Sequence, residues 1–185
     1  MAGGIKAWQG LTAAGPPEAG MSFFTPAADS GELIALAWLL EEGSRAFYAA
    51  IARMQSAPEA TELFSALVTA EERHKTSLLE VYRETTGMDP GAEFPRNLPV
   101  AQGAGDRMEG NVNVSEAIAW AKGKGTRDLL ELSMALETDS YDLYIKMSRT
   151  VPGEGARKVF ARLVAEEKEH LARMATLLDK DLSEA

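Results

Sequence analysis

The chain has 185 residues, of which 45% are apolar and 25% are charged, which is enough for one well-packed domain and short for two. Its formal net charge of −9 argues against nucleic acid and anionic membrane surfaces as main partners. The absence of cysteine excludes disulfides, thiolate zinc sites, iron–sulfur ligation and thiol nucleophiles.

The first 28 residues are rich in glycine, alanine and proline, with Gly15-Pro16-Pro17 as the firmest break, and we interpret residues 1–28 as an N-terminal extension. They lack a basic segment followed by an apolar run, so no secretory signal is readable. No stretch of the chain approaches the roughly 18 apolar residues that would span a bilayer. We therefore expect a soluble cytoplasmic protein with no membrane partner.

A pair of long helices is predicted next. The first begins at Asp29-Ser30-Gly31-Glu32, an acidic N-cap with a glutamate three residues on, and runs to about Met54 on an apolar stripe. The second begins at Ser56-Ala57-Pro58-Glu59, a capping box with proline in the first turn, and runs to about Thr86, where Gly87 is placed to cap it. Because only a few residues join them, the two helices should be antiparallel neighbours.

Residues 87–113 contain three prolines and five glycines with no periodicity, which predicts a long crossover connection. A short helix follows, over about 115–122. Two further long helices are predicted over about 126–150 and 155–178, with Pro152-Gly153 between them. The chain therefore contains a second helical pair after the crossover.

A shift of 96 residues, the separation of His74 and His170, places this second pair on the first. The other matches include Leu40-Glu41 with Leu136-Glu137, Phe47-Tyr48 with Leu143-Tyr144, and Phe64 with Phe160. Two similar helical hairpins joined by one long crossover predict an all-α four-helix bundle with pseudo-twofold symmetry.

Six side chains at matching positions are candidate metal ligands: Glu41, Glu71, His74, Glu137, Glu167 and His170. On the second and fourth long helices, a glutamate and a histidine three residues apart lie on the apolar stripe. Each such pair can present two ligands to one ion. The two remaining glutamates border the stripes of the first and third long helices. This is the ligand count and spacing of a carboxylate-bridged dimetal centre inside a four-helix bundle.

Charge balance favours metal at these positions. Four unpaired carboxylates in an apolar centre would be strongly destabilising, and no lysine or arginine falls on the stripe to offset them. Two divalent cations would balance them, and the alternative is protonation with raised pKa values. One Glu-x-x-His motif is weak evidence, but two buried copies with partner glutamates favour the metal interpretation. Oxygen-rich ligands with one nitrogen per ion suit iron or manganese, although zinc could bind as well.

Two tyrosines, Tyr48 and Tyr144, lie seven residues after Glu41 and Glu137, which is two turns along the same helix face. They either hydrogen-bond ligand carboxylates or are core tyrosines with hydroxyls satisfied elsewhere, and the sequence leaves both open. Four acidic neighbours of the candidate ligands lack symmetric stripe positions and are interpreted as solvated: Glu42, Glu72, Glu166 and Glu169.

The chain resembles the rubrerythrin branch of the ferritin-like superfamily over residues 29 to about 180. The motifs that carry the resemblance are Glu41 with Tyr48, Glu71-x-x-His74, Glu137 with Tyr144, and Glu167-x-x-His170. The resemblance implies a ferritin-like dimetal domain over 29–180, followed by a tail over 181–185. It also implies two iron ions held by the six candidate ligands, with Glu71 and Glu167 as bridges.

Two departures from that family affect the expected chemistry. Rubrerythrins carry a further glutamate one turn after the third-helix ligand, whereas this chain has Ser140 there and Ser44 at the repeat position. The carboxylate that shifts with iron redox state in the family is therefore missing, and the remaining ligand set is similar to that of bacterioferritins. The family's rubredoxin-type iron site needs four cysteines, which this chain lacks. Electrons would have to come from an external donor protein.

The function that the resemblance implies is a di-iron oxidoreductase that reduces peroxide or dioxygen, in a homodimer or higher homo-oligomer. Iron storage or delivery without turnover is one alternative, although storage cages usually carry a further short helix after the bundle. A structural dimetal site in an interaction module is another. Helix exchange between protomers stays open because the crossover is long.

A short N-terminal segment, Gly3-Gly4-Ile5-Lys6-Ala7-Trp8, is similar to the last helix of a rhodanese domain. This similarity suggests a start site or boundary inside a longer rhodanese–ferritin-like fusion, or a relic of one. The alternative is an ordinary disordered tail.

Overall fold

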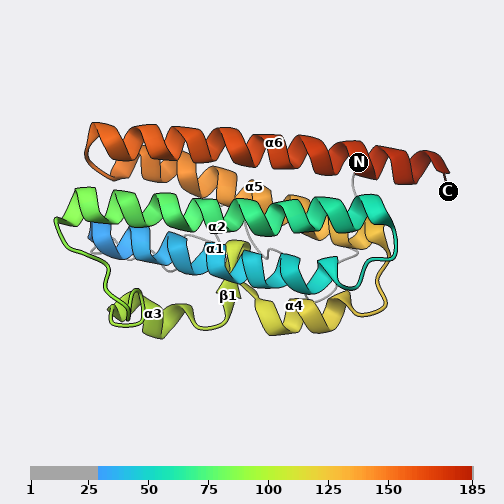
Figure 1. The fold of residues 1–185 in the computed structure, drawn as a ribbon, viewed down its shortest axis with the longest axis horizontal. Coiled ribbons are helices and arrows are strands. Elements are labelled where there is room, and N and C mark those ends of the chain that lie inside the picture. Colours follow the sequence, from blue (N-terminus) through green and yellow to red (C-terminus); the bar gives the residue numbers. More distant parts are fainter. Residues whose placement is uncertain (1–28, 185) are drawn as a thin grey trace.

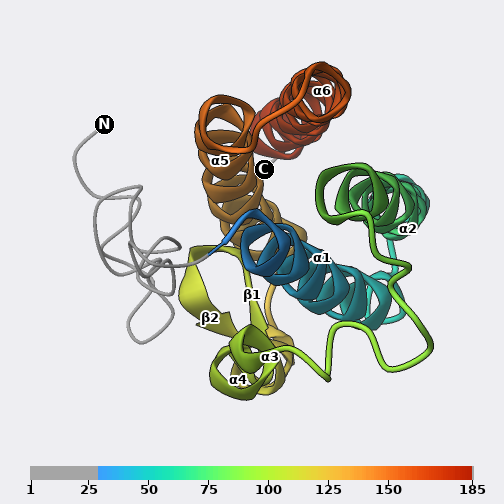
Figure 2. The ribbon, with the colours of Figure 1, turned by 90° about the vertical axis from the view of Figure 1, so that its left-hand side faces the viewer.

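The computed structural model describes residues 29–184, apart from the side chains of 102–104 and 184. Its four long helices are α1 (Ser30–Ala52), α2 (Pro58–Thr86), α5 (Thr126–Thr150) and α6 (Glu154–Glu184). Helix α1 packs against α2, and α5 packs against α6. Of the contacts between the two hairpins, that of α2 with α6 is more extensive than that of α1 with α5. Figure 2 gives the view along the bundle. The predicted all-α bundle of two hairpins joined by a long crossover is confirmed.

The ends of the first two helices follow local capping rules, with one exception. At the start of α1, Asp29 accepts from the Glu32 amide and the Glu32 side chain accepts from the Asp29 amide, as predicted. The predicted capping box of α2 is wrong, because Pro58 begins the helix and makes Ala57 the N-cap, with no side-chain hydrogen bond. Gly87 closes α2 in the left-handed conformation (φ 70°), as predicted.

Two predicted helix ends differ from the structure. Helix α1 ends at Ala52, so Met54 lies beyond it and is 40% exposed rather than part of the core. Helix α6 continues past the predicted end at Leu178 to Glu184, since no glycine or proline interrupts the intervening sequence. Most of the predicted C-terminal tail is therefore helical.

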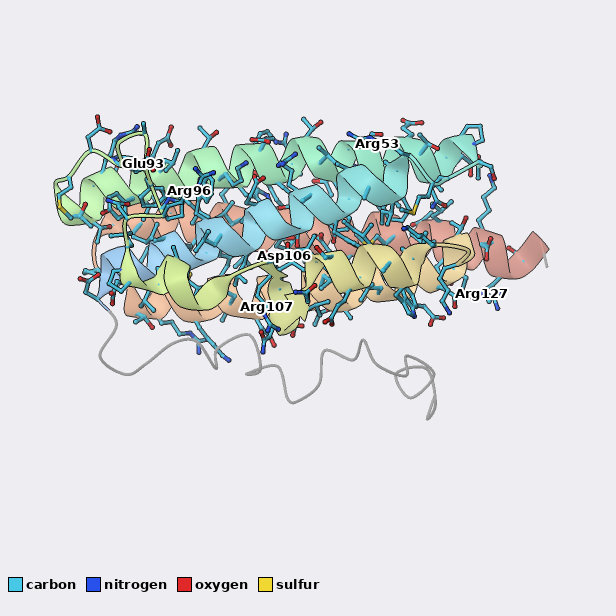
Figure 3. All side chains as sticks on the ribbon, turned by 90° about the horizontal axis from the view of Figure 1, so that it is seen from below. Arg53, Glu93, Arg96, Asp106, Arg107 and Arg127 are labelled. Atoms are coloured by element: carbon cyan, nitrogen blue, oxygen red, sulfur yellow. The ribbon has the colours of Figure 1, made fainter. Side chains whose placement is uncertain are left out.

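The crossover contains more structure than its sequence pattern predicted. Its elements are α3 (Pro99–Ala104), β1 (Arg107–Met108), the 3-10 helix η3 (Glu109–Asn111), β2 (Val112–Asn113) and α4 (Val114–Ala121). Only α4 was predicted. Strands β1 and β2 form a small antiparallel pair, and α3, β1 and α4 pack along α1 (Figure 1). Asp106 and Arg107 lie near the middle of the bundle's length (Figure 3).

The apolar core has two parts, one toward each end of the bundle. One contains Phe47, Phe64 and Leu132, and the other contains Leu78 and Phe160 together with their neighbours. Apart from Glu109 of η3, the buried acidic and imidazole side chains come from the middle of the four helices, between these parts. Among the described residues, no helix is both long and apolar enough to cross a membrane. The predicted N-terminal extension over 1–28, with its rhodanese-like segment, lies outside the described residues.

Candidate metal centre

All six candidate ligands are buried, and each comes from near the middle of its long helix. The residues, each at most 5% exposed, are Glu41, Glu71, His74, Glu137, Glu167 and His170. The i and i+3 spacing places each histidine beside the glutamate of its own helix: Nδ1 of His74 is 3.3 Å from Glu71 Oε2, and Nδ1 of His170 is 3.3 Å from Glu167 Oε2. The helix periodicity therefore aims both pairs at the bundle centre.

The six side chains converge from both hairpins. His74 Nδ1 lies 3.3 Å from Glu41 Oε2 and 3.3 Å from Glu167 Oε1, which belongs to the other hairpin. His170 Nδ1 lies 2.8 Å from Glu137 Oε2. The two imidazole rings stack with their centroids 5.7 Å apart. Both histidines therefore direct Nδ1 toward the carboxylates.

Two overlapping groups have the geometry to hold metal ions. Glu41, His74 and Glu167 form one, and Glu137, Glu167 and His170 form the other, with the ligand atoms of each group within 4.8 Å of one another. Glu167 belongs to both groups, which is the position of a bridging carboxylate. Glu71 belongs to neither group and contacts His74 and Glu41 at the edge of the first.

The carboxylates of this cluster do not ionise independently. Burial, together with the neighbouring Glu41, raises the pKa of Glu71 well above its usual value, and burial with the neighbouring Glu137 does the same for Glu167. Burial also opposes ionisation of Glu137, but hydrogen bonds to Glu167, His170 and Tyr48 lower its pKa to about 2. The metal-free cluster therefore keeps protons that bound cations would displace.

Unsatisfied buried atoms show that the cluster fits a metal. Glu41 Oε1 and Glu167 Oε2 are buried and accept no hydrogen bond within the part of the chain that the structure describes. Such atoms are rare in folded proteins and need a partner. Four carboxylates would balance two divalent ions, and the two imidazoles would add one nitrogen to each ion. The donor set is oxygen-rich, which suits iron or manganese.

The two tyrosines have different surroundings. The Tyr48 hydroxyl donates a 2.6 Å hydrogen bond to Glu137 Oε1. The Tyr144 hydroxyl is buried and has no hydrogen-bond partner among the described residues. Tyr48 therefore has the predicted hydrogen bond to a candidate ligand, whereas within residues 29–184 the Tyr144 hydroxyl bonds neither a ligand nor any other group.

Glu166 was predicted to be solvated, and the structure bears this out only in part. Its side chain is 28% exposed, and its Oε2 lies 3.2 Å from His74 Nε2. The hydrogen bond to His74 is the main reason that the pKa of Glu166 is lowered. The 96-residue repeat did not predict this contact, because the residue that corresponds to Glu166 in the first half is Ala70, which has no carboxylate. A carboxylate on Nε2 holds the ring so that Nδ1 faces the other acids.

A further buried acid, Glu109 of η3, was not predicted. It is 3% exposed and accepts a hydrogen bond from the Ser44 hydroxyl. Burial, together with the charge of Glu71, raises the pKa of Glu109 to about 8. It lies in the irregular crossover, where no periodic pattern indicates which side chains are buried.

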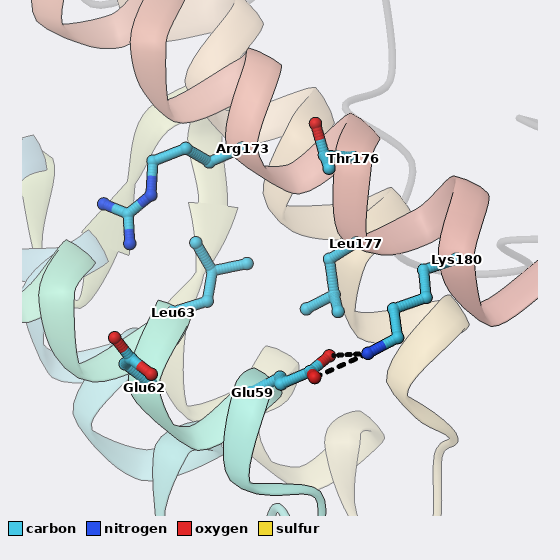
Figure 4. A pocket seen from close by; sticks show the side chains of 7 residues that line it. All are labelled: Glu59, Glu62, Leu63, Arg173, Thr176, Leu177 and Lys180. Carbon is cyan, nitrogen blue, oxygen red and sulfur yellow. Dashed lines mark hydrogen bonds and ion pairs between the residues drawn. The ribbon is translucent and has the colours of Figure 1, made fainter.

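A surface pocket between α2 and α6 is separate from this centre (Figure 4). Its lining includes Leu63 and Leu177, and one side is closed by an ion pair of 2.5 Å between Lys180 Nζ and Glu59 Oε1. None of the six candidate ligands lines it. The candidate metal centre therefore lies inside the bundle rather than in this pocket.

Comparison with known protein families gives one result that covers most of the chain. The family model described as Rubrerythrin matches residues 32–178, a range that contains all six candidate ligands. Searches among curated proteins and among solved structures gave no significant match. The family match agrees with the all-α bundle and with the buried cluster of glutamates and histidines. The chain therefore belongs to the rubrerythrin family, whose members are ferritin-like di-iron carboxylate proteins.

Proposed function

We propose that this protein is a non-haem di-iron oxidoreductase that reduces peroxide or dioxygen. The observation that carries the proposal is the pair of buried ligand groups that share Glu167, in a chain of the rubrerythrin family. We assign Glu41, His74, Glu71 and the shared Glu167 to one ion. Glu137 and His170, with Glu167, would hold the other. Glu167 is then the shared carboxylate, whereas Glu71, which the resemblance gave as a second bridge, is assigned to one ion. Manganese or zinc could occupy the same positions, so the identity of the metal is part of the proposal.

When bound, two iron ions supply Lewis acidity and the two electrons that reductive cleavage of an O–O bond requires. The protein contributes charge, orientation and exclusion of water. The four helix glutamates would neutralise the ions, while Glu166 would orient the His74 ring and Tyr48 would fix one oxygen of Glu137 through the hydrogen bonds that they form. The two apolar core clusters on either side keep bulk water away from the site.

The electrons for each turnover would come from another protein. These 185 residues contain no cysteine, so they cannot themselves hold a thiolate-bound iron that would pass electrons to the centre. We propose an external electron-donor protein as a partner, and a homodimer or higher homo-oligomer as the working form. Its ferritin-like domain would span residues 29–180.

The proposal is tested by loading the purified protein with ferrous iron under anaerobic conditions and then adding peroxide. We expect two irons per chain and a new absorption in the near ultraviolet as the metals are oxidised. Glu71→Ala and His170→Ala should lose this response with the fold intact, as checked by circular dichroism. Glu169→Ala is the matched control, because Glu169 is an exposed acid on the same helix as His170.

Full activity in Glu71→Ala or His170→Ala would contradict the proposal. Iron that is oxidised once, and that no reductant or donor protein returns to the ferrous state, would indicate storage rather than turnover. A protein that unfolds on chelation and shows no change with peroxide would indicate a structural site.

A further inference from the structure

We propose that Glu109 is a further metal ligand of the dimetal centre, supplied by the crossover and held by Ser44 when no metal is bound. The inference rests on the proposed metal binding by the six helix residues. It concerns a side chain outside the four long helices, and it gives the crossover a function beyond connecting the two hairpins.

The crossover is built to bring Glu109 against α1. The Arg107 backbone lies against Gly43, where any Cβ would overlap the Arg107 carbonyl, so glycine is needed on that helix face. After Glu109 the chain turns sharply through Gly110 (φ 66°) and Asn111 (φ 62°), both in the left-handed region. The β1–β2 pair closes the turn. These features hold a short segment between α1 and α5.

Burial of the Glu109 carboxylate destabilises the fold unless an opposite charge lies beside it. It is 3% exposed, and the charged groups that act on it most strongly are the acids Glu71 and Glu137. Ser44 is its one side-chain hydrogen-bond partner among the described residues. A buried acid whose hydrogen-bond donors are neutral, here the Ser44 hydroxyl and its own backbone, costs stability, and an apolar side chain would fill the space at less cost. A cation in the centre would supply the missing opposite charge.

The two halves of the bundle differ in the hydrogen bonds of Ser44 and Ser140, and this difference supports a ligand role for Glu109. Ser140 Oγ donates a 3.1 Å hydrogen bond to Glu167, the carboxylate shared by both ligand groups. The 96-residue repeat would pair Ser44 with Glu71 in the same way. Ser44 instead donates to Glu109, and Glu71 lies outside both ligand groups. Glu109 therefore accepts from Ser44 the same kind of hydrogen bond that the shared carboxylate Glu167 accepts from Ser140.

The test is an anaerobic titration of the full-length protein with Co²⁺, whose visible absorption reports coordination number and whose affinity is measured by competition with a chelator. Wild type is expected to bind two Co²⁺ per chain. Glu109→Gln keeps the shape of the side chain and should weaken at least one Co²⁺ site about tenfold or more. Its spectrum should change toward the stronger absorption of a lower coordination number. Ser44→Ala should bind Co²⁺ as tightly as wild type or more tightly, because no hydrogen bond to Glu109 has to break.

Glu116→Gln is the control, because Glu116 is an exposed acid of the same crossover region, in α4. Thermal unfolding of each metal-free variant shows whether the fold is kept. If Glu109→Gln has the wild-type Co²⁺ affinity and spectrum, Glu109 is a structural residue and the inference is wrong. If wild type itself binds no Co²⁺, the proposed metal function fails, which is a different result from a change confined to Glu109→Gln.

Discussion

The Tyr48 hydroxyl donates a 2.6 Å hydrogen bond to Glu137 Oε1, and this bond joins α1 of one hairpin to α5 of the other. The repeat-related pair is Tyr144 and Glu41, and in the described structure neither the Tyr144 hydroxyl nor Glu41 Oε1 has a hydrogen-bond partner. The two halves thus place the same residue types at the centre, but only the Tyr48–Glu137 pair has the hydrogen bond between tyrosine and carboxylate in the described structure.

Tyr48→Phe is expected to affect the metal centre more than Tyr144→Phe. Removing the Tyr48 hydroxyl leaves a buried oxygen of Glu137 with one donor fewer, which should lower the free energy of unfolding by about 1–3 kcal/mol. It should also weaken metal binding about tenfold, the scale of changes beside metal ligands. Tyr144→Phe removes a hydroxyl without a described partner and should be close to neutral. Urea unfolding and chelator competition measure both effects, and equal losses in the two variants would contradict this account.

Glu166→Ala is expected to weaken metal binding at the ion that His74 holds. The Glu166 carboxylate 3.2 Å from His74 Nε2 fixes the ring orientation, and loss of such a partner typically costs about 10–100-fold in affinity. Glu166→Gln retains an acceptor oxygen and should recover part of the loss. Glu169→Ala, at an exposed position on the same helix, should match wild type. If all three variants bind metal equally, the contact with His74 has no function.

The stability of the metal-free protein should fall as the pH rises from about 5 to about 8. The pKa values of Glu71 and Glu167 are raised well above 4.5 by burial, and that of Glu109 is raised to about 8. The folded state therefore holds more protons than the unfolded state across this range, so the free energy of unfolding decreases with pH. Glu137, with a pKa lowered to about 2, titrates below the range.

Added Zn²⁺ should oppose this trend, because metal binds the deprotonated ligands and stabilises the folded state more at higher pH. Calorimetry of metal-free and zinc-loaded protein at several pH values measures both curves. A melting temperature of the metal-free protein that increases from about pH 5 to about pH 8 would show that the buried acids are not the main titrating groups.

Gly43→Ala is expected to destabilise the fold by about 1–3 kcal/mol, the usual cost of overpacking. Its Cβ would overlap the Arg107 carbonyl, and backbone cannot move aside as a flexible side chain can. Gly91→Ala is the matched control, since no atom lies within 4 Å of a Cβ there. Chemical denaturation compares the two variants. A Gly43→Ala protein as stable as Gly91→Ala would mean that the crossover does not depend on close contact with α1.

The long helices were predictable because each shows an apolar stripe at helical spacing, and the repeat identified the six candidate ligands through their matching offsets. Both signals depend on regular structure. Glu109 lies in an irregular segment whose burial is set by the turn at Gly110 and by contact with Gly43, and neither is visible as a pattern. Glu166 was missed for a related reason: it reaches from α6 to α2, and symmetry has no information about a contact present in one half alone.

The most direct test of the central claim is anomalous diffraction from crystals of the protein grown with Mn²⁺ or loaded with iron. The account predicts two anomalous peaks inside the bundle, one beside His74 and the other beside His170, with Glu167 between them. Crystals with the same fold but no peak among these residues, or with metal bound only at the surface, would contradict it.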